Sequence, residues 1–215
     1  MIASAERVHR FASEDLDRMV AAGVLRPDDR VELILGVLYD LSPRRSRHTA
    51  AVHKMLDALR AAYSDVGAHV RVQSPLRLAG DSQPEPDLAV VSGAIDDSID
   101  SHPTSAVLVV EVADSSLRLD RVQKASMYAT SGVPDYWILN LVDDCLETYT
   151  TPVVGATCAA HRLRPRGCGR RPWLGRFRPR VPRGGRSPAS TARVSGVGHG
   201  AVPSPRVLRF ARRLR

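Results

Sequence analysis

The order of apolar and polar positions along the chain predicts a mixed α/β fold. Two runs, residues 88–91 and 107–110, are apolar at every position, which is typical of strands that are covered on both faces of a sheet. Residues 46–62 instead repeat their apolar positions at helical spacing and contain neither Gly nor Pro. We therefore expect central strands at 87–91 and 106–113, with a long helix packed against them.

The remaining elements follow from the same two periodicities and from the turn residues between them. The expected helices cover 13–22 and 115–131, and the other expected strands cover 31–35, 37–41, 68–78, 134–141 and 145–151. Gly36 between the first two of these strands predicts a hairpin. The predicted fold class is α/β, with a mixed central β-sheet flanked by helices and antiparallel hairpins at its edges.

Composition divides the chain after residue 151. Residues 1–151 hold 15 Lys and Arg against 23 Asp and Glu, a net charge of −8, whereas residues 152–215 hold 16 Arg and no Lys, Asp or Glu, a net charge of +16. The second part is rich in Arg, Pro, Gly and Ser, and such a segment buries too little apolar surface to offset its chain entropy. We predict a folded domain over 1–151 and an irregular, disordered Arg-rich tail over 152–215.

Two explanations of this tail stay open at the sequence level. An Arg-rich tail binds phosphate backbones without sequence preference. A shifted reading frame in a GC-rich gene would produce the same bias, because GC-rich codons encode Arg, Pro, Gly and Ala, and it would explain why Lys and acidic residues are missing. Resequencing the region around codons 150 to 155 separates the two explanations, since an intact frame contradicts the second.

The chain contains no apolar run of about 18 residues or more, and its first ten residues lack the apolar stretch of a secretory signal. We therefore expect a cytoplasmic protein with no membrane partner. The three cysteines, Cys145, Cys158 and Cys168, are odd in number and form no C-x-x-C pair. This pattern argues against a disulfide framework and against a zinc site.

Candidate chemistry lies at the ends of the two central strands. Asp87 begins one apolar run, Glu111 closes the next, and Lys124 lies in the helical segment that follows. Two carboxylates with one ammonium beside them can bind a divalent cation and position a water, as in a metal-dependent phosphodiesterase. The structural alternative is that Asp87 marks a turn and that Glu111 is a solvated strand end.

Other polar residues near these positions have structural readings as well as functional ones. His48 starts the long helix, where its imidazole could face a cleft, and Gln73 could line the same cleft or serve only the fold. We expect Asp114 and Ser115 to cap the following helix. Asp120 is expected to lie in solvent or to pair with a neighbouring basic side chain, Arg121 or Lys124.

Seven short motifs occur in order between residues 31 and 151. They cover 31–40, 42–43 with His48 after it, 72–76, 85–91, 109–115, 120–128 and 132–138. Taken together, they resemble the Uma-type restriction endonucleases, a bacterial family within the PD-(D/E)XK nuclease superfamily. The resemblance implies a restriction endonuclease-like core and a Mg²⁺-dependent endonuclease that hydrolyses phosphodiester bonds in nucleic acid, with DNA as the expected partner.

The resemblance also implies which residues form the site. Asp87 stands at the metal-binding Pro-Asp position and Glu111 at the second acidic position, and the backbone carbonyl of Val112 would complete the metal ligands. The metal would be Mg²⁺, with Mn²⁺ as a substitute.

The superfamily's usual lysine position falls on Ala113, which cannot serve. In the family the lysine stands in the following helix, where Lys124 matches it and would act in catalysis. Glu32 matches the acid of the first element, as an outer metal ligand or a positioner of water.

The charge of the folded part fits DNA binding poorly, because a duplex is usually bound by a basic face. A local patch could supply that face, from Arg44, Arg45, Arg47, Arg71 and Arg77. The alternative function is a catalytically weak or inactive nuclease-fold protein that acts as a nucleic-acid-binding or interaction module. Family analogy also implies a homodimer, because two sites cut both strands of a duplex most easily.

Overall fold

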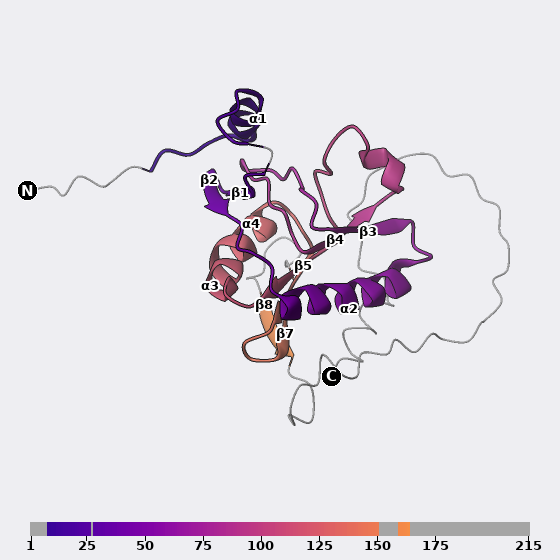
Figure 1. The fold of residues 1–215 in the computed structure, drawn as a ribbon. Coiled ribbons are helices and arrows are strands. Elements are labelled where there is room, and N and C mark those ends of the chain that lie inside the picture. The colour runs from indigo at the N-terminus through magenta and orange to yellow at the C-terminus, as the bar shows by residue number, and fades with distance from the viewer. Residues whose placement is uncertain (1–7, 27, 151–158, 164–215) are drawn as a thin grey trace, which may run out of the picture.

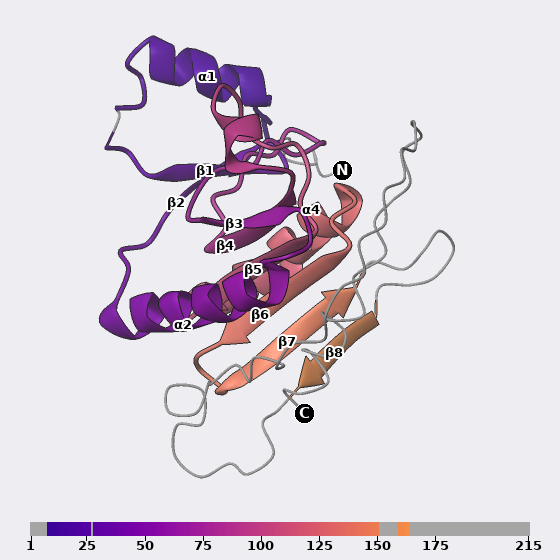
Figure 2. The same ribbon diagram turned by 90° about the vertical axis from the view of Figure 1, so that its right-hand side faces the viewer.

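The computed structural model describes residues 8–26, 28–150 and 159–163. Its main element is a six-stranded sheet in the order β3-β4-β5-β6-β7-β8, beside a two-stranded sheet of β1 and β2. The six strands are β3 (Ala68–Val72), β4 (Leu88–Ser92), β5 (Leu108–Ala113), β6 (Asp135–Asn140), β7 (Cys145–Thr150) and β8 (Ala159–Leu163). Helices lie on both faces of this sheet (Figures 1 and 2), so the predicted mixed α/β class is confirmed.

Strand direction places the carboxyl end of β5 beside the start of β4. The pair β4–β5 is antiparallel, and the pair β5–β6 is parallel, while the other neighbouring pairs of the sheet are antiparallel. The predicted central strands are confirmed, since β5 is buried at all its positions and β4 at all but its last. Residues that precede β4 therefore meet residues that end β5.

The long helix α2 (Ser46–Tyr63) covers one face of the sheet, as its spacing predicts (Figure 2). Its buried side chains include Val52, Met55 and Leu59, which belong to one apolar cluster with Leu88 and Leu108 of the central strands. A helix that buries one stripe in this way is held by packing rather than by its own propensity. The start of α2 lies at the edge where β4 begins and β5 ends, because His48 contacts Asp87.

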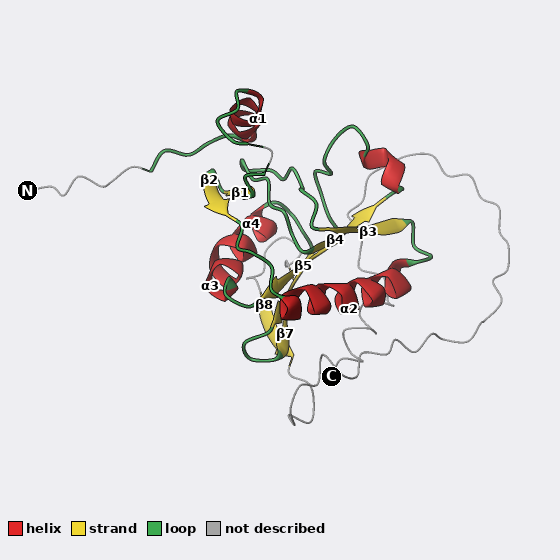
Figure 3. Ribbon diagram, in the orientation of Figure 1, coloured by secondary structure: helices red, strands yellow, loops and turns green. Residues whose placement is uncertain are grey.

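The other face is covered by the crossover between β5 and β6. The sequence predicts one helix over 115–131, and the structure has three joined parts (Figure 3): α3 (Leu117–Leu119), the π-helical turn η2 (Asp120–Lys124) and α4 (Ala125–Thr130). The capping prediction for Asp114 and Ser115 is wrong, because the N-cap is Ser116, with no side-chain cap hydrogen bond. Asp114 lies instead 3.9 Å from the Arg45 guanidinium.

The predicted hairpin is present, formed by β1 (Val31–Ile34) and β2 (Val37–Asp40). Its turn residues Leu35 and Gly36 both have positive φ, at 50° and 77°, as a tight hairpin turn requires. A Cβ at Gly36 would also lie 2.7 Å from the Arg10 Cβ, so only glycine fits there. Beyond the hairpin lies α1 (Ser13–Ala21), which is preceded by Ala12, whose N–H donates to Asp15.

Two predicted boundaries differ from the structure. The strand expected over 68–78 ends at Val72, because Gln73 takes a left-handed conformation (φ 45°) and donates its N–H to the Asp87 carbonyl. The sequence predicts no strand after residue 151, but β8 pairs antiparallel with β7. The other residues of the predicted tail, 152–158 and 164–215, lie outside the described residues. Among the helices that the structure describes, none is long and apolar enough to span a membrane.

Candidate active site

Asp87 is held in place by three hydrogen bonds. Its Oδ2 accepts from the Val112 N–H (2.9 Å) and lies 3.1 Å from the His48 Nε2, and its Oδ1 accepts from the Gln73 amide (3.1 Å). Burial alone would raise the pKa of Asp87, but His48 and the other two donors outweigh it and hold the pKa below the ordinary value. The carboxylate is therefore ionised and fixed in orientation.

Glu111 faces the crossover helix from the middle of β5. Its Oε1 accepts hydrogen bonds from the Lys124 Nζ (3.1 Å) and from the Tyr128 hydroxyl (2.9 Å). Burial, together with the nearby carboxylates, raises the pKa of Glu111 well above its ordinary value, although Lys124 acts in the opposite direction. Glu111 is thus a shielded carboxyl whose ionisation depends on the ammonium beside it.

Lys124 lies among three carboxylates. Its Nζ is 3.0 Å from Glu32, 3.1 Å from Glu111 and 3.9 Å from Asp120. These four side chains are only 1–6% exposed. Burial alone would lower the pKa of Lys124, but the carboxylates outweigh it and raise the pKa, so the ammonium stays charged.

Two residues of the site, Asp120 and Tyr128, were not predicted as parts of it. Asp120 is buried, accepts from the Ser116 hydroxyl at 2.6 Å and lies near Lys124, which agrees with one of its expected pairings. Burial raises the pKa of Asp120 to about 6. The signal in the sequence is the spacing of Asp120, Lys124 and Tyr128, which are four residues apart and so share one face of a helix.

The structure brings the predicted residues Glu32, Asp87, Glu111 and Lys124 together where β4 begins and β5 ends. In the described part of the chain, Asp87 and Glu111 share no hydrogen-bond donor. Val112 connects them, because it follows Glu111 in β5 and donates its N–H to Asp87. The role of the Val112 carbonyl as a metal ligand stays a prediction.

The donor set suits a hard divalent cation. Three carboxylates, those of Glu32, Glu111 and Asp120, face one ammonium, and the buried Asp87 carboxylate lies near them. Their full ionisation therefore leaves negative charge without a matching cation in a buried place. Carboxylate oxygens are the ligands that Mg²⁺ and Mn²⁺ prefer. The residues therefore fit the ion that the sequence resemblance implies.

A second group of potential ligands lies at the hairpin between β6 and β7, formed by Asp143, Cys145 and Glu147. Glu147 is already compensated by Arg121, whose Nε and Nη2 lie 2.9 and 2.5 Å from its two oxygens. Asn140 also donates to Asp143 and to Glu147. This group is therefore a satisfied polar network with a thiol in it, which suits Mg²⁺ less well.

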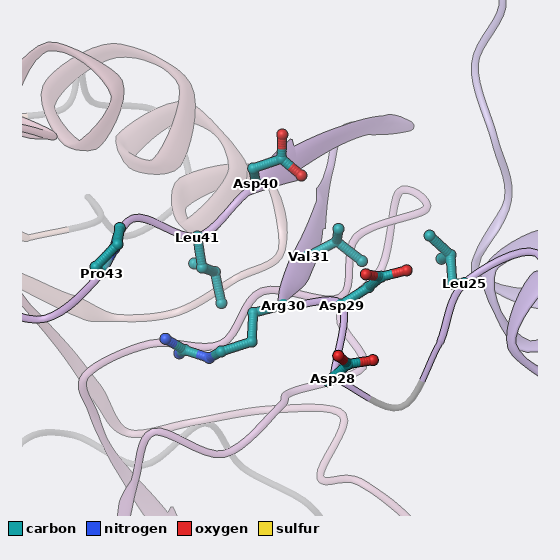
Figure 4. A pocket seen from close by; sticks show the side chains of 8 residues that line it. All are labelled: Leu25, Asp28, Asp29, Arg30, Val31, Asp40, Leu41 and Pro43. Carbon is teal, nitrogen blue, oxygen red and sulfur yellow. The ribbon is translucent and has the colours of Figure 1, made fainter.

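A hollow of about 690 Å³ lies at the open end of the β1–β2 hairpin, between the segment before β1 and the segment after β2. Figure 4 shows its lining residues, Leu25, Asp28, Asp29, Arg30, Val31, Asp40, Leu41 and Pro43. Three of these side chains are acidic, so the hollow itself does not favour phosphate. Arg30 connects it to the site, because its guanidinium contacts Glu85, two residues before Asp87.

The fold and the site define a restriction endonuclease-like α/β protein. The family model described as "Putative restriction endonuclease" (Uma2) matches residues 13–166, and the chain belongs to this family. The match extends past residue 151 and includes β8.

Comparison with solved structures supports the fold. A crystal structure of "a putative nuclease belonging to DUF820" from Anabaena variabilis superposes with a TM-score of 0.55 at 11% sequence identity, and the match covers 70% of this chain and 83% of that chain. No curated protein sequence matches the chain.

Proposed function

We propose that this protein is a metal-dependent endonuclease that hydrolyses phosphodiester bonds in DNA. The observation that carries the proposal is the position of Lys124, which lies within hydrogen-bond distance of Glu32 and Glu111. Val112, the residue after Glu111 in β5, donates its N–H to Asp87, so this acid also lies close to the same place. Membership of a restriction endonuclease family supports a hydrolase that acts on phosphodiester bonds. The metal dependence and the DNA substrate are parts of the proposal.

Asp87 and Glu111 would hold the cation, Mg²⁺ or Mn²⁺, together with the carbonyl of Val112. A bound divalent cation supplies a water of lowered pKa and stabilises negative charge on the phosphate. His48 and Gln73 keep the Asp87 carboxylate in one orientation through their hydrogen bonds. Fixed ligands of this kind lower the reorganisation that binding requires.

Lys124 would donate a hydrogen bond to the attacking water or to the phosphoryl oxygens. In the reaction, a water oxygen forms a bond to phosphorus, the bond from phosphorus to the leaving oxygen breaks, and that oxygen takes up a proton. Glu32 of β1 and Glu111 of β5 both contact the Lys124 ammonium, at 3.0 and 3.1 Å. The ammonium is therefore positioned before substrate binds.

Two observations favour the alternative, a nuclease-fold module that binds nucleic acid without turnover. Residues 1–151 have a net charge of −8, and Lys124 is already compensated by three buried carboxylates. Metal dependence separates the two functions, because binding through basic residues survives chelation and catalysis does not.

The test is cleavage of supercoiled plasmid by the full chain in Mg²⁺, in Mn²⁺ and in EDTA. We expect nicking with either metal, none in EDTA, and loss of nicking in Asp87→Asn and Lys124→Ala. Asp57→Asn is the matched control, because Asp57 is exposed on α2. A folded wild type that does not cut in either metal supports the binding module, and cutting by Asp87→Asn at the wild-type rate contradicts the site.

A further inference from the structure

Two arginine side chains converge on one carboxylate oxygen at the edge of the candidate active site. The Nη2 atoms of Arg30 and Arg44 lie 2.8 and 2.7 Å from the same Oε1 of Glu85. Arg30 precedes β1 and Arg44 lies between β2 and α2, so the two side chains come from the segments on either side of the β1–β2 hairpin. Among these three side chains, two cations face one anion.

The arginine pair is tied to the site through Glu85. Glu85 stands two residues before Asp87, and its backbone N–H donates to the Glu32 Oε2 at 3.4 Å. Glu32 in turn contacts the Lys124 ammonium. The position of the two guanidinium groups is therefore fixed relative to the residues proposed to act on the phosphodiester.

Both guanidinium groups keep donors for another anion. Each carries five N–H donors, and each recorded contact with Glu85 uses one Nη2. The side chains of Arg30 and Arg44 are 38% and 34% exposed. In Figure 4 the Arg30 side chain extends away from Asp28 and Asp29, so these acids do not occupy its guanidinium.

We propose that Arg30 and Arg44 together bind a backbone phosphate of the DNA substrate next to the phosphodiester that is cut. This inference rests on the proposed function. Glu85 holds the two guanidinium groups around one oxygen, and a phosphate oxygen would accept from the donors that remain. The pair supplies positive charge at the site, although the domain as a whole is acidic.

The other arginines of the predicted basic patch lie in different surroundings. Arg45 and Arg47 each have one long contact, at 3.9 Å to Asp114 and 3.8 Å to Asp144. Arg77 is paired with Glu14 and Asp17 of α1, at 3.1 and 2.9 Å. Arg18→Gln is the matched control, because Arg18 of α1 is an exposed guanidinium that is ion-paired with Asp15 and lies outside both the site and the predicted basic patch.

The experiment compares the full-length wild type with Arg30→Gln, Arg44→Gln, the double variant and Arg18→Gln. Cleavage of a fluorescent DNA duplex in Mg²⁺ gives kcat and KM. Fluorescence anisotropy of the same duplex, in Ca²⁺ and at several salt concentrations, gives the binding constant and its dependence on salt. The Arg-rich residues 152–215 are the same in every variant, so differences report the substituted side chain. Arg44→Lys tests whether charge alone is enough.

We expect each single variant to raise KM about tenfold with kcat little changed, since a hydrogen bond between charged groups is lost. The slope of log binding constant against log salt should fall by about 1 for each arginine removed, and Arg44→Lys should keep the slope but raise KM. If the Arg30 and Arg44 variants cleave in a metal-dependent way with the same KM and the same salt slope as Arg18→Gln, the phosphate site is overturned. If the wild type does not cut DNA, the salt slopes still test the phosphate site. Failure of the proposed nuclease function can therefore be distinguished from failure of the phosphate site.

Discussion

At the residue scale, the site depends on one ammonium that compensates several buried carboxylates. Lys124 contacts Glu32, Glu111 and Asp120, and all four side chains are almost fully buried. Charges in such a place are tolerated only when they are paired and hydrogen-bonded. Removal of Lys124 should therefore reduce stability as well as activity.

We predict that Lys124→Met lowers the free energy of unfolding by about 3–5 kcal/mol near neutral pH, because it leaves buried carboxylates without their cation. The loss should be smaller at acidic pH, where Glu111 and Asp120, whose pKa values are raised, take up protons. Urea unfolding at both pH values measures this. The double variant Glu111→Gln, Lys124→Met should lose less than the sum of its single variants, and additive losses would contradict the pairing.

Asp135 gives a second prediction, remote from the site. It begins β6 opposite Leu108, at the end of β5 away from Val112, which donates its N–H to Asp87. Burial raises the pKa of Asp135 from 3.8 to about 6. The folded state then keeps this proton to higher pH than the unfolded state does, so this carboxyl lowers stability as pH rises from about 4 to about 6, and the loss persists above that range.

Asp135→Asn should therefore raise the melting temperature at about pH 8 and change it little at about pH 4. Thermal unfolding at the two pH values measures the effect, with the exposed Asp57→Asn as control. Plasmid nicking should be unaffected, because Asp135 lies at the opposite end of the sheet. An equal shift of the melting temperature at both pH values would show that ionisation of Asp135 is not the cause.

At the scale of elements, the π-helical turn η2 connects the site to the β6–β7 hairpin. Asp120 and Lys124 lie at its ends, and Arg121 between them binds Glu147 through two hydrogen bonds. A π-helical turn within a helix often marks a functional site, since its geometry is less favourable than that of an α-helix. The Arg121–Glu147 pair therefore anchors a turn whose other face carries the ammonium.

We predict that Arg121→Gln lowers kcat for plasmid cleavage roughly tenfold or more while KM changes little, because a displaced Lys124 is poorly oriented for the reaction. The stability should fall by about 2 kcal/mol, since hydrogen bonds between charged groups are lost. Arg118→Gln, in α3 and exposed, is the control. Equal effects of the two substitutions on kcat would contradict the anchoring role.

At the scale of the whole molecule, strands with continuous apolar runs were predictable and long-range contacts were not. Local sequence patterns predicted β4, β5 and the hairpin at Gly36. A strand that is buried on both faces is apolar at successive positions, and a tight turn needs glycine, so both can be recognised in the sequence. The end of β3 depends on Gln73 reaching Asp87, and β8 depends on pairing with β7. Such contacts join distant residues and leave no local signal.

The candidate site also consists of residues that the sequence predicted and of contacts that it did not. Asp87, Glu111 and Lys124 were proposed from their positions at the strand ends and in the following helix, and Glu32 was added by the resemblance to the family. The fold brings them together where β4 begins and β5 ends. The burial of Asp120 and the hydrogen bond from Tyr128 to Glu111 depend on how the crossover helix packs on the sheet. Their regular spacing with Lys124 was visible, but spacing alone does not say which helix face is buried.

The most direct test of the proposed function is where the protein binds Mn²⁺, because the fold offers two acidic groups. Binding to the full chain is followed by the electron paramagnetic resonance signal of free Mn²⁺, for the wild type, Asp87→Asn and Asp143→Asn. We expect the wild type and Asp143→Asn to bind Mn²⁺ alike and Asp87→Asn to bind much more weakly. Unchanged binding by Asp87→Asn, with loss in Asp143→Asn, would place the metal at the β6–β7 hairpin and contradict the proposed active site.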